Sequence, residues 1–578
     1  MRRSMPQQGE YVHRDGQAIL PGRTDTSPGQ VMQRVRQLRI LLPMGWRAIY
    51  GQAHAFRRPD RARSLEKCRL RLRVGGRITL ARHEARSRRT NLQARLFVLE
   101  RGCVHPQCGF HDSPCARNLQ KPQLPGGGDA MILFENVRLL SFNPPGISDE
   151  CDLVAYGPED CGAKAGTIAE IGAGLRAKYQ QAEFAGSGGY LSPGLVCSHT
   201  HLYSALARGM EVAIQPSKDF AQILDHLWWR LDRAIDEPIL EASALAGCAD
   251  ALAAGVTSLV DHHASPSAIE GSLSVIRQAY EEVGLRGILC YETTDRNGAE
   301  GARAGLSENL RFAREVDGMR ARGSLPLVEA AIGGHAGFTV GQETLEGLAD
   351  AVKTSGRGIH IHLAEDKYDA VDSRHRYGLD LVERLERAGA LTPKGIIGHG
   401  LWLTPSEIEI MNARDVFLAH NARSNMNNAV GYNTLLPTHR NVVLGTDGMG
   451  ADMLEEFKFA VFRHRESGGP WWPDNFLACL DRGNRLLERY FPGEGSFGVL
   501  ATGNPADLVL WDYDPPTPLD AANIAGHMAF GMSSRSVRSV AVAGKIRIKD
   551  RKPLFAMEKI QAVARIQARR LWNKMEGR

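Results

Sequence analysis

One stretch of the sequence reads Leu195-Val196-Cys197-Ser198-His199-Thr200-His201, a short apolar run that ends in two histidines. A strand buried on both faces of a parallel sheet typically shows such a continuous apolar run. Residues i and i+2 of a strand point to the same side, so both imidazoles face the same way. The stretch therefore predicts a buried parallel strand with two histidines at its carboxyl end.

The same unit, an apolar run followed by polar residues and a helical stretch, recurs along the chain from Leu191 onward. The other runs are residues 257–260, 287–290, 327–332, 358–361, 395–397, 416–419 and 442–444. Eight strands that alternate with helices are typical of a (β/α)8 TIM barrel, an α/β fold that carries its chemistry at the carboxyl ends of the strands. We therefore expect a TIM barrel over residues 191–499.

Three more of these strand ends carry residues of the kind that bind metals. His360-Ile361-His362-Leu363-Ala364-Glu365 belongs to the fifth run, His399 follows the sixth and Asp447 follows the eighth. A lone histidine in a strand is more often a packed residue than a ligand, but four such strand ends together are hard to explain as core packing. Imidazole and carboxylate are ligands that Zn²⁺ and similar ions prefer. The pattern predicts a metal centre at the mouth of the barrel.

This order of residues resembles the amidohydrolase superfamily, in the branch that contains cytosine deaminases, guanine deaminases and triazine hydrolases. More narrowly, five stretches resemble the SsnA-type aminohydrolases, which are associated with selenium and purine metabolism: residues 227–233, 261–266, 292–297, 420–428 and 523–527. The resemblance covers Met131–Arg578 and does not extend into residues 1–130. It implies a hydrolase that acts on carbon–nitrogen bonds other than peptide bonds.

The resemblance also implies roles for single residues. The implied ligands of one divalent ion, zinc first and iron or manganese as alternatives, are His199, His201, His362 and Asp447. Glu365 and His399 become the catalytic pair. Glu365 can protonate a ring nitrogen and then the leaving ammonia, and His399 can hydrogen-bond the oxygen as attack proceeds. Asp447 can also accept a proton from water, whose pKa a bound Zn²⁺ lowers to about 7.

Binuclear members of this superfamily have a carboxylated lysine at the end of strand four. Residues 327–338 contain no lysine, which favours one ion. His335 is then expected to line the substrate pocket, although Gly337 stands where the related pattern usually has Pro. The other residues expected at the pocket are His262, His263, Trp228 and Asn421. His262 and His263 are equally compatible with a position outside the pocket, where they would contact the metal ligands. Trp228 is also compatible with core packing.

The segments on both sides of the barrel show a different pattern. In residues 131–190 and 500–556, apolar and polar residues alternate within stretches that are bounded by turn residues. This pattern indicates strands. In the amidohydrolases such flanking strands pair into a small composite β-sandwich, and the resemblance implies the same here. Residues 557–578 have apolar residues at helical spacing from Met557 to Met575, so we expect an amphipathic helix at the end of the chain.

The first 130 residues differ in composition. Residues 1–130 contain 25 Lys and Arg against 9 Asp and Glu, a net charge of +16, whereas the remainder has 46 against 56, a net charge of −10. Residues 1–130 show little helical or strand periodicity. We therefore expect either a disordered extension or a start codon assigned upstream of the native Met131. The alternatives are a nucleic-acid-binding tail and a zinc knuckle over residues 103–115.

A chain that begins at Met131 is expected to melt within a few degrees of the full chain, because residues 1–130 bring no apolar periodicity to bury. Calorimetry of the two chains checks this expectation. A larger fall in melting temperature on removal of residues 1–130 would contradict it.

The leading functional hypothesis is hydrolytic deamination of a small amino- or imino-substituted heterocycle, purine-like or pyrimidine-like. The alternatives are hydrolysis of a cyclic amide or chlorinated ring, and a non-catalytic barrel that has lost its metal. No apolar run approaches the ~20 residues that a membrane span needs, and the cysteines form no disulfide framework. We expect a cytoplasmic homo-oligomer, a dimer or tetramer, with a small-molecule substrate and no membrane or nucleic-acid partner.

Overall fold

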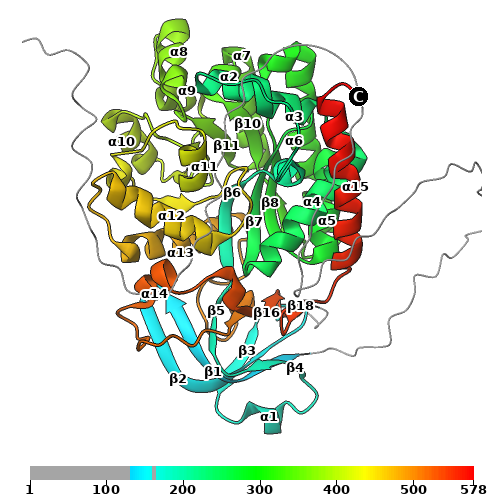
Figure 1. Ribbon diagram of the computed structural model, residues 1–578, viewed down its shortest axis with the longest axis vertical. Helices are drawn as coiled ribbons and strands as arrows, with labels where there is room; N and C mark the ends of the chain where they lie inside the picture. The colour runs from blue at the N-terminus through cyan, green and yellow to red at the C-terminus, as the bar shows by residue number, and fades with distance from the viewer. Residues whose placement is uncertain (1–130, 159–163) are drawn as a thin grey trace, which may run out of the picture. The chain divides into compact units, whose positions relative to one another are not determined.

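The computed structural model describes residues 131–158 and 164–578. The basic segment 1–130, with its expected knuckle and start site, lies outside the described residues. Figure 1 shows two parts in the described region: a barrel covered by helices and, below it in this view, a sheet built from both ends of the described chain.

The barrel consists of parallel strands in two hydrogen-bonded groups. The first group is β6 (Leu195–Thr200), β7 (Val256–His263), β8 (Arg286–Tyr291) and β9 (Val328–Ala330), and the second is β10 (Ile332–Ala336), β11 (Ile359–Leu363), β12 (Ile396–His399), β13 (Phe417–His420) and β14 (Val442–Leu444). β9 and β10 form one strand that is interrupted at Ala331. The amides of Thr446 and Asp447 donate to the His199 carbonyl oxygen, which joins the end of β14 to β6. The expected strands and the TIM barrel are confirmed.

The barrel strands are buried along their whole length, which explains their continuous apolar sequences. The helices of this part are α2 (Phe220–Ile223), α3 (Trp229–Arg233), α4 (Glu237–Ala253), α5 (Ser272–Val283), α6 (Gly298–Ala321), α7 (Gln342–Ser355), α8 (Lys367–Tyr377), α9 (Leu381–Ala388), α10 (Pro405–Ala413), α11 (Ala422–Asn427), α12 (Met453–Glu466) and α13 (Pro473–Tyr490). Local signals fix their ends: the Asp236 side chain accepts from the Ile239 amide at the start of α4, and α5 stops at Gly284, which has a φ of 81°.

The flanking segments form one mixed sheet of nine strands. Its order is β18-β17-β16-β15-β5-β1-β2-β3, with β4 also paired to β1. The strands are β1 (Ile132–Phe142), β2 (Pro145–Ala155), β3 (Ile168–Gly172), β4 (Glu183–Ser187), β5 (Tyr190–Pro193), β15 (Leu508–Trp511), β16 (Val537–Val542), β17 (Lys545–Lys549) and β18 (Lys552–Pro553). The antiparallel pair β5–β15 joins the two segments. The two flanking segments therefore form one composite domain whose nine strands belong to a single sheet. Its apolar core includes Phe134, Leu508 and Ala541.

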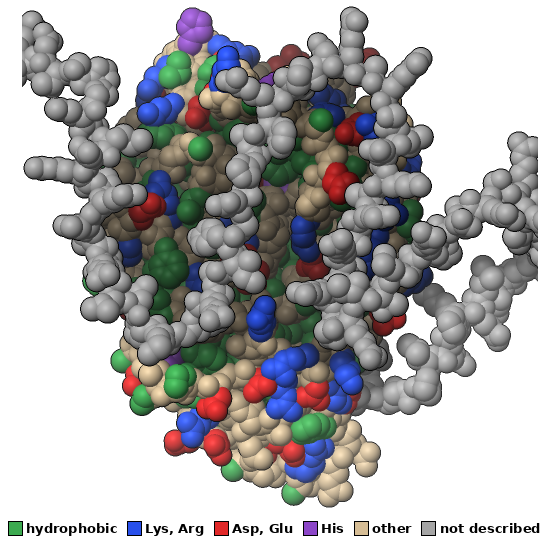
Figure 2. Space-filling view, in the orientation of Figure 1, with side chains coloured by type: hydrophobic (Ala, Val, Ile, Leu, Met, Phe, Trp, Pro, Cys, Tyr) green, Lys and Arg blue, Asp and Glu red, His purple; other side chains and the backbone are tan. Residues whose placement is uncertain are grey.

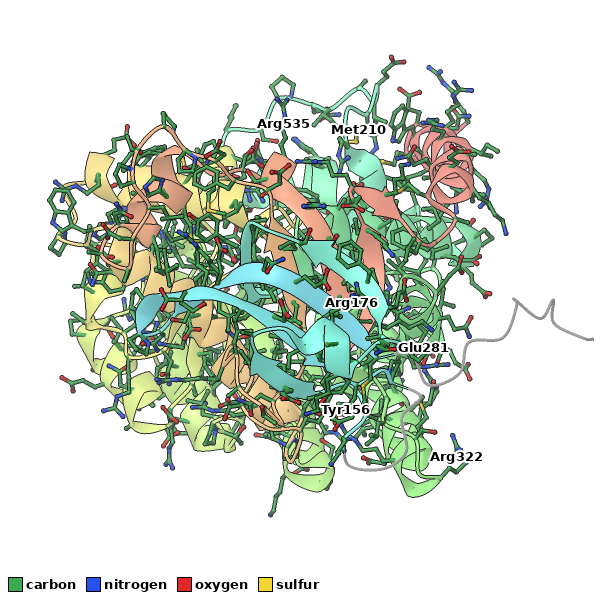
Figure 3. The ribbon with its side chains drawn as sticks, turned by 90° about the horizontal axis from the view of Figure 1, so that it is seen from below. Tyr156, Arg176, Met210, Glu281, Arg322 and Arg535 are labelled. Carbon is green, nitrogen blue, oxygen red and sulfur yellow. The ribbon has the colours of Figure 1, made fainter. Side chains whose placement is uncertain are left out.

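Seen from below in Figure 3, strands of this sheet cross in front of the barrel, with Arg176 of α1 (Leu175–Lys178) among them. Arg176 Nε donates to Glu135 Oε1 at 2.7 Å, and its guanidinium lies 5.4 Å from the centre of the Phe184 ring, so α1 is held to β1 and β4. Acidic and basic side chains are interspersed on the visible face of this domain in Figure 2.

The last helix, α15 (Met557–Met575), lies against α4 and has the expected bounds. Arg570 and Lys574 pair with Asp236, the residue that caps α4, and Trp572 Nε1 donates to the Leu206 carbonyl oxygen at 2.9 Å. Within residues 131–158 and 164–578, none of the helices has the length and apolar character that crossing a membrane requires.

Candidate active site

The four expected metal ligands meet at the carboxyl ends of the barrel strands. His199 Nε2 lies 3.1 Å from Asp447 Oδ1, and His201 Nε2 lies 2.7 Å from the same oxygen. His362 Nε2 lies 3.1 Å from His199 Nε2. β6, β11 and the turn after β14 supply these side chains, and parallel strands of a barrel all end at one face. The fold therefore brings together residues that are far apart in the sequence.

The chemistry of this donor set fits a divalent metal ion. The ligand atoms of His199, His362, His399 and Asp447 lie within 4.8 Å of one another, and all four residues are buried. The expected ligand His201 is not in this group and instead shares a second one with His262 and His362. A metal site needs neutral imidazoles and an ionised carboxylate. Burial lowers the pKa of His199 to about 4 and holds the pKa of His362 well below its ordinary value. Burial alone would raise the pKa of Asp447, but His201 and His199 hold it well below its ordinary value.

The same site attracts positive charge. Burial opposes protonation of His201, yet the nearby Asp447 carboxylate raises the pKa of His201 well above its ordinary value. His399, which the sequence assigns to catalysis alone, also lies within the group that could hold an ion. The histidines behind the cluster form an outer layer: His199 Nδ1 lies 2.8 Å from His360 Nε2, which leaves His199 Nε2 directed at the cluster.

Three strand ends at this face have unusual backbone. Ala364, His399 and Asp447 have φ angles of 51°, 69° and 52°, in the left-handed region that favours glycine. Such conformations cost about 1–3 kcal/mol each and persist only where the surrounding structure holds them. At Asp447 the amide donates to the His199 carbonyl oxygen at 3.0 Å, which fixes the turn against β6. Strain of this kind is typical of functional sites.

Glu365 lies beside the ligand cluster. Its Oε2 is 3.5 Å from His399 Nε2, which in turn is 3.9 Å from Asp447 Oδ1. Burial raises the pKa of Glu365 to about 7, although the charge of His399 opposes the shift. His399 Nδ1 donates to Asn425 Oδ1 at 2.8 Å, whereas its Nε2 is buried without a hydrogen-bond partner among the described residues. That nitrogen is therefore available to a reacting molecule.

Helix α11 supplies contacts that sequence reasoning missed. Ser424 Oγ donates to Asp447 Oδ2 at 2.5 Å, and Asn428 Nδ2 donates to Glu365 Oε1 at 3.2 Å. With Asn425, these residues hold three of the expected site residues in place. The polar run of residues 424–428 was visible in the sequence, but such a run on a helix more often faces solvent, so the signal is weak.

A pocket adjoins the cluster, lined by aromatic side chains and carboxylates. Its aromatic residues are Tyr203, Phe220, Trp228, Trp229, Phe338 and Tyr368, and its acidic residues are Asp232, Glu292, Glu365, Asp366, Asp369 and Asp447. His335 and Trp228 line it, as expected. His335 Nδ1 lies 2.6 Å from Thr339 Oγ1, so the loop that contains Gly337 still directs His335 to the pocket.

Three other residues expected at the pocket do not line it: His262, His263 and Asn421. Consecutive side chains of a strand point to opposite sides, so the two histidines of β7 diverge. The His262 ring stacks on His360, and its carbonyl oxygen accepts from His201 Nδ1 at 2.5 Å. His263 Nε2 lies 2.8 Å from Ser265 Oγ. Asn421 is fully buried immediately before α11.

Known proteins resemble this chain over the same region. The amidohydrolase family matches residues 190–547. The 5-methylthioadenosine/S-adenosylhomocysteine deaminase of Pelotomaculum thermopropionicum is 31% identical over 400 residues, which cover 67% of this chain and 88% of that protein. These matches do not test the narrower SsnA-type resemblance, which stays a prediction.

Two solved structures share the fold. The zinc-bound adenosine deaminase from Xanthomonas campestris has a TM-score of 0.64 at 22% identity, covering 76% of this chain and 98% of that one. Atrazine chlorohydrolase TrzN from Arthrobacter aurescens TC1, complexed with zinc, has a TM-score of 0.61 at 21% identity, covering 76% and 100%. The family match, the relative and the cluster of histidine and aspartate at the carboxyl face of the barrel establish together that the chain belongs to the amidohydrolase family.

Proposed function

We propose that this chain is a metal-dependent deaminase that hydrolyses a carbon–nitrogen bond of a small purine-like or pyrimidine-like heterocycle. The observation that carries the proposal is Glu365, a buried carboxyl whose pKa is raised to about 7. It lines the pocket and lies 3.5 Å from His399 Nε2. An amine leaves readily only when it is protonated, and a carboxylic acid with a pKa near neutrality is an effective donor.

In this proposal His199, His201, His362 and Asp447 hold one divalent ion, with zinc as the first candidate. Such an ion lowers the pKa of a water molecule to about 7. The single ion is supported by the absence of lysine from residues 327–338. Zinc is supported by the imidazole-rich donor set.

The residues of the chain divide the proton transfers between them. Glu365 begins protonated and donates to a ring nitrogen, which makes the adjacent carbon more electrophilic. Asp447 accepts a proton from the attacking water. His399, held by Asn425 through Nδ1, directs Nε2 at the oxygen and hydrogen-bonds it as charge develops there. Glu365, protonated again by the hydroxyl group of the tetrahedral species, then protonates the amine nitrogen, which leaves as ammonia. The proton held by Asp447 restores Glu365 for the next turnover.

Ammonia release from a panel of purines, pyrimidines, pterins and guanidino compounds tests the proposal. We expect the metal-replete chain to release ammonia from at least one ring compound and the Glu365→Gln variant to release far less. Turnover of cyclic amides or chlorinated rings without ammonia would instead favour the alternative hydrolase activity.

We expect kcat/KM to be constant below pH 7 and to fall about tenfold per pH unit above it. Glu365 must carry a proton to act, and its pKa of about 7 means that this proton is lost as the pH rises. A pH–rate profile from pH ~5 to ~9 measures this. The residual activity of Glu365→Gln should lack the fall, and a wild-type profile without it would contradict the assigned role.

We also infer a cytoplasmic homo-oligomer without nucleic-acid partners. Five free cysteines in the described region support a reducing compartment. The side chains of Phe462 and Phe530, exposed by 49% and 72%, have ring centres 5.8 Å apart and support a subunit contact.

A further inference from the structure

The pocket wall contains more acidic than basic side chains. Six carboxyl groups and three histidines line the pocket, and its lining residues, all of them described, include neither lysine nor arginine. Arg296 lies behind the wall, with its guanidinium 5.2 Å from the centre of the Trp229 ring, and it pairs with Asp232. This arginine is therefore paired with one of the six acidic residues.

Five of the six carboxylates have a protein partner. Asp232 pairs with Arg296, Glu365 accepts from Asn428, Asp366 accepts from the Tyr368 amide at 2.9 Å, Asp369 accepts from the Ala364 amide at 2.7 Å, and Asp447 accepts from Ser424. These contacts account for the structural or catalytic use of each group.

Glu292, which follows β8, differs from the other five. It is 2% exposed, and its Oε1 has no hydrogen-bond partner among the described residues. Asp232 and Asp369 also have one unpartnered oxygen each, but a protein donor contacts their other oxygen. His201 Nδ1 and His262 Nδ1 lie 3.2 and 3.4 Å from Glu292 Oε1. The N–H of His201 Nδ1 is directed to the His262 carbonyl oxygen at 2.5 Å, and His262 donates from Nε2 to the carbonyl oxygens of Gly334 and His360 at 3.0 and 3.2 Å. His335 Nε2 is 3.7 Å from Oε2, too far for a hydrogen bond. A buried carboxylate without donors is costly unless a bound molecule supplies them.

Aromatic side chains form part of the surrounding wall. The His335 ring lies 6.4 Å from the Trp229 ring and 6.4 Å from the Phe338 ring, measured between centres. Aromatic faces attract cations in addition to stacking on planar groups. Glu292 therefore lies in a wall where a planar cation is favoured and an anion is not.

We propose that Glu292 binds an amidine- or guanidine-type N–H edge of the substrate. The inference rests on the proposed deaminase function and deepens it: the substrate is a flat heterocycle whose edge offers adjacent N–H donors, and phosphorylated or carboxylated analogues are excluded. An N–H donor to an ionised carboxylate forms a charge-assisted hydrogen bond, which is roughly twice as strong as a neutral one.

Calorimetric titration of the metal-replete full chain with benzamidine and benzamide tests this inference without requiring turnover. The two probes have nearly the same shape, but only benzamidine carries a cationic N–H edge. We expect benzamidine to bind ~10–100-fold more tightly than benzamide, as expected for a charge-assisted hydrogen bond. In Glu292→Gln we expect the difference to shrink to roughly threefold or less, because the amide keeps the size but loses the charge.

The matched control is Glu409→Gln, which removes the same charge from an exposed position of α10 outside the pocket. It should keep the preference for benzamidine. Equal binding of the two probes by the wild-type chain would overturn the inference, as would an unchanged preference in Glu292→Gln. If Glu292→Gln fails to fold, Glu292→Asp takes its place and should keep only part of the preference; an unchanged preference in Glu292→Asp would then overturn the inference.

The two experiments distinguish failure of this inference from failure of the proposed deaminase function. A Glu292-dependent preference without ammonia release from any panel compound would uphold the inference about binding and refute deamination. Ammonia release without that preference would uphold deamination and refute the role of Glu292.

Discussion

Replacement of Glu365 by glutamine is expected to lower kcat by ~10²–10⁴-fold while metal content stays at the wild-type value. Glutamine keeps the size of the side chain and can still accept from Asn428, but it cannot give up a proton. The loss corresponds to about 3–5 kcal/mol of transition-state stabilisation. Because Glu365 follows the ligand His362 by three residues, metal content measured by elemental analysis separates a catalytic role from a ligand role.

Glu409→Gln again serves as the matched control and should leave kcat and metal content unchanged. Loss of metal from Glu365→Gln would mean that Glu365 is itself a ligand and that the site is built differently. Undiminished turnover would mean that the leaving group needs no proton, which would move the chlorinated-ring alternative ahead of deamination.

Replacement of His199 by alanine is expected to remove metal and activity together. His199 contacts the other expected ligands His362 and Asp447 directly, at 3.1 Å in each case, and it is completely buried. Loss of a residue that hydrogen-bonds a metal ligand typically lowers metal affinity by ~10–100-fold. Loss of the ligand itself should lower it by more. Elemental analysis and zinc competition with a chelator measure the effect.

An independent readout is the melting temperature with and without zinc. A bound ion stabilises the folded state by mass action, so zinc should raise the melting temperature of the wild-type chain and not that of His199→Ala. His375→Ala, which changes an exposed histidine of α8, should behave like the wild type. Two stoichiometric ions per wild-type chain would contradict the single-ion site, and full occupancy in His199→Ala would contradict the ligand set.

The sequence alone determined the barrel and the strand ends that carry candidate metal ligands. The eight strands are short apolar runs because both faces of each strand are buried, and this pattern is local enough to be recognised without a structure. The ligand roles of His199, His201, His362 and Asp447 were implied by the family resemblance. Barrel topology explains why these residues lie together, since it brings all carboxyl strand ends to one face.

Only the tertiary structure decided which of the other polar residues meet the site. His262 and His263 are adjacent in the sequence, yet strand alternation and the position of His360 turn both away from the pocket. Ser424 and Asn428 reach Asp447 and Glu365 because α11 packs at the barrel mouth.

Glu292 gave no signal of its own, since a single glutamate after a strand is common. Its significance depends on the N–H of His201 being directed to the His262 carbonyl oxygen and on Arg296 being paired with Asp232. Periodicity reports whether a residue is buried, because burial repeats along an element. Hydrogen-bond pairing among buried polar groups depends on distances between separate elements, and a linear sequence does not contain those distances.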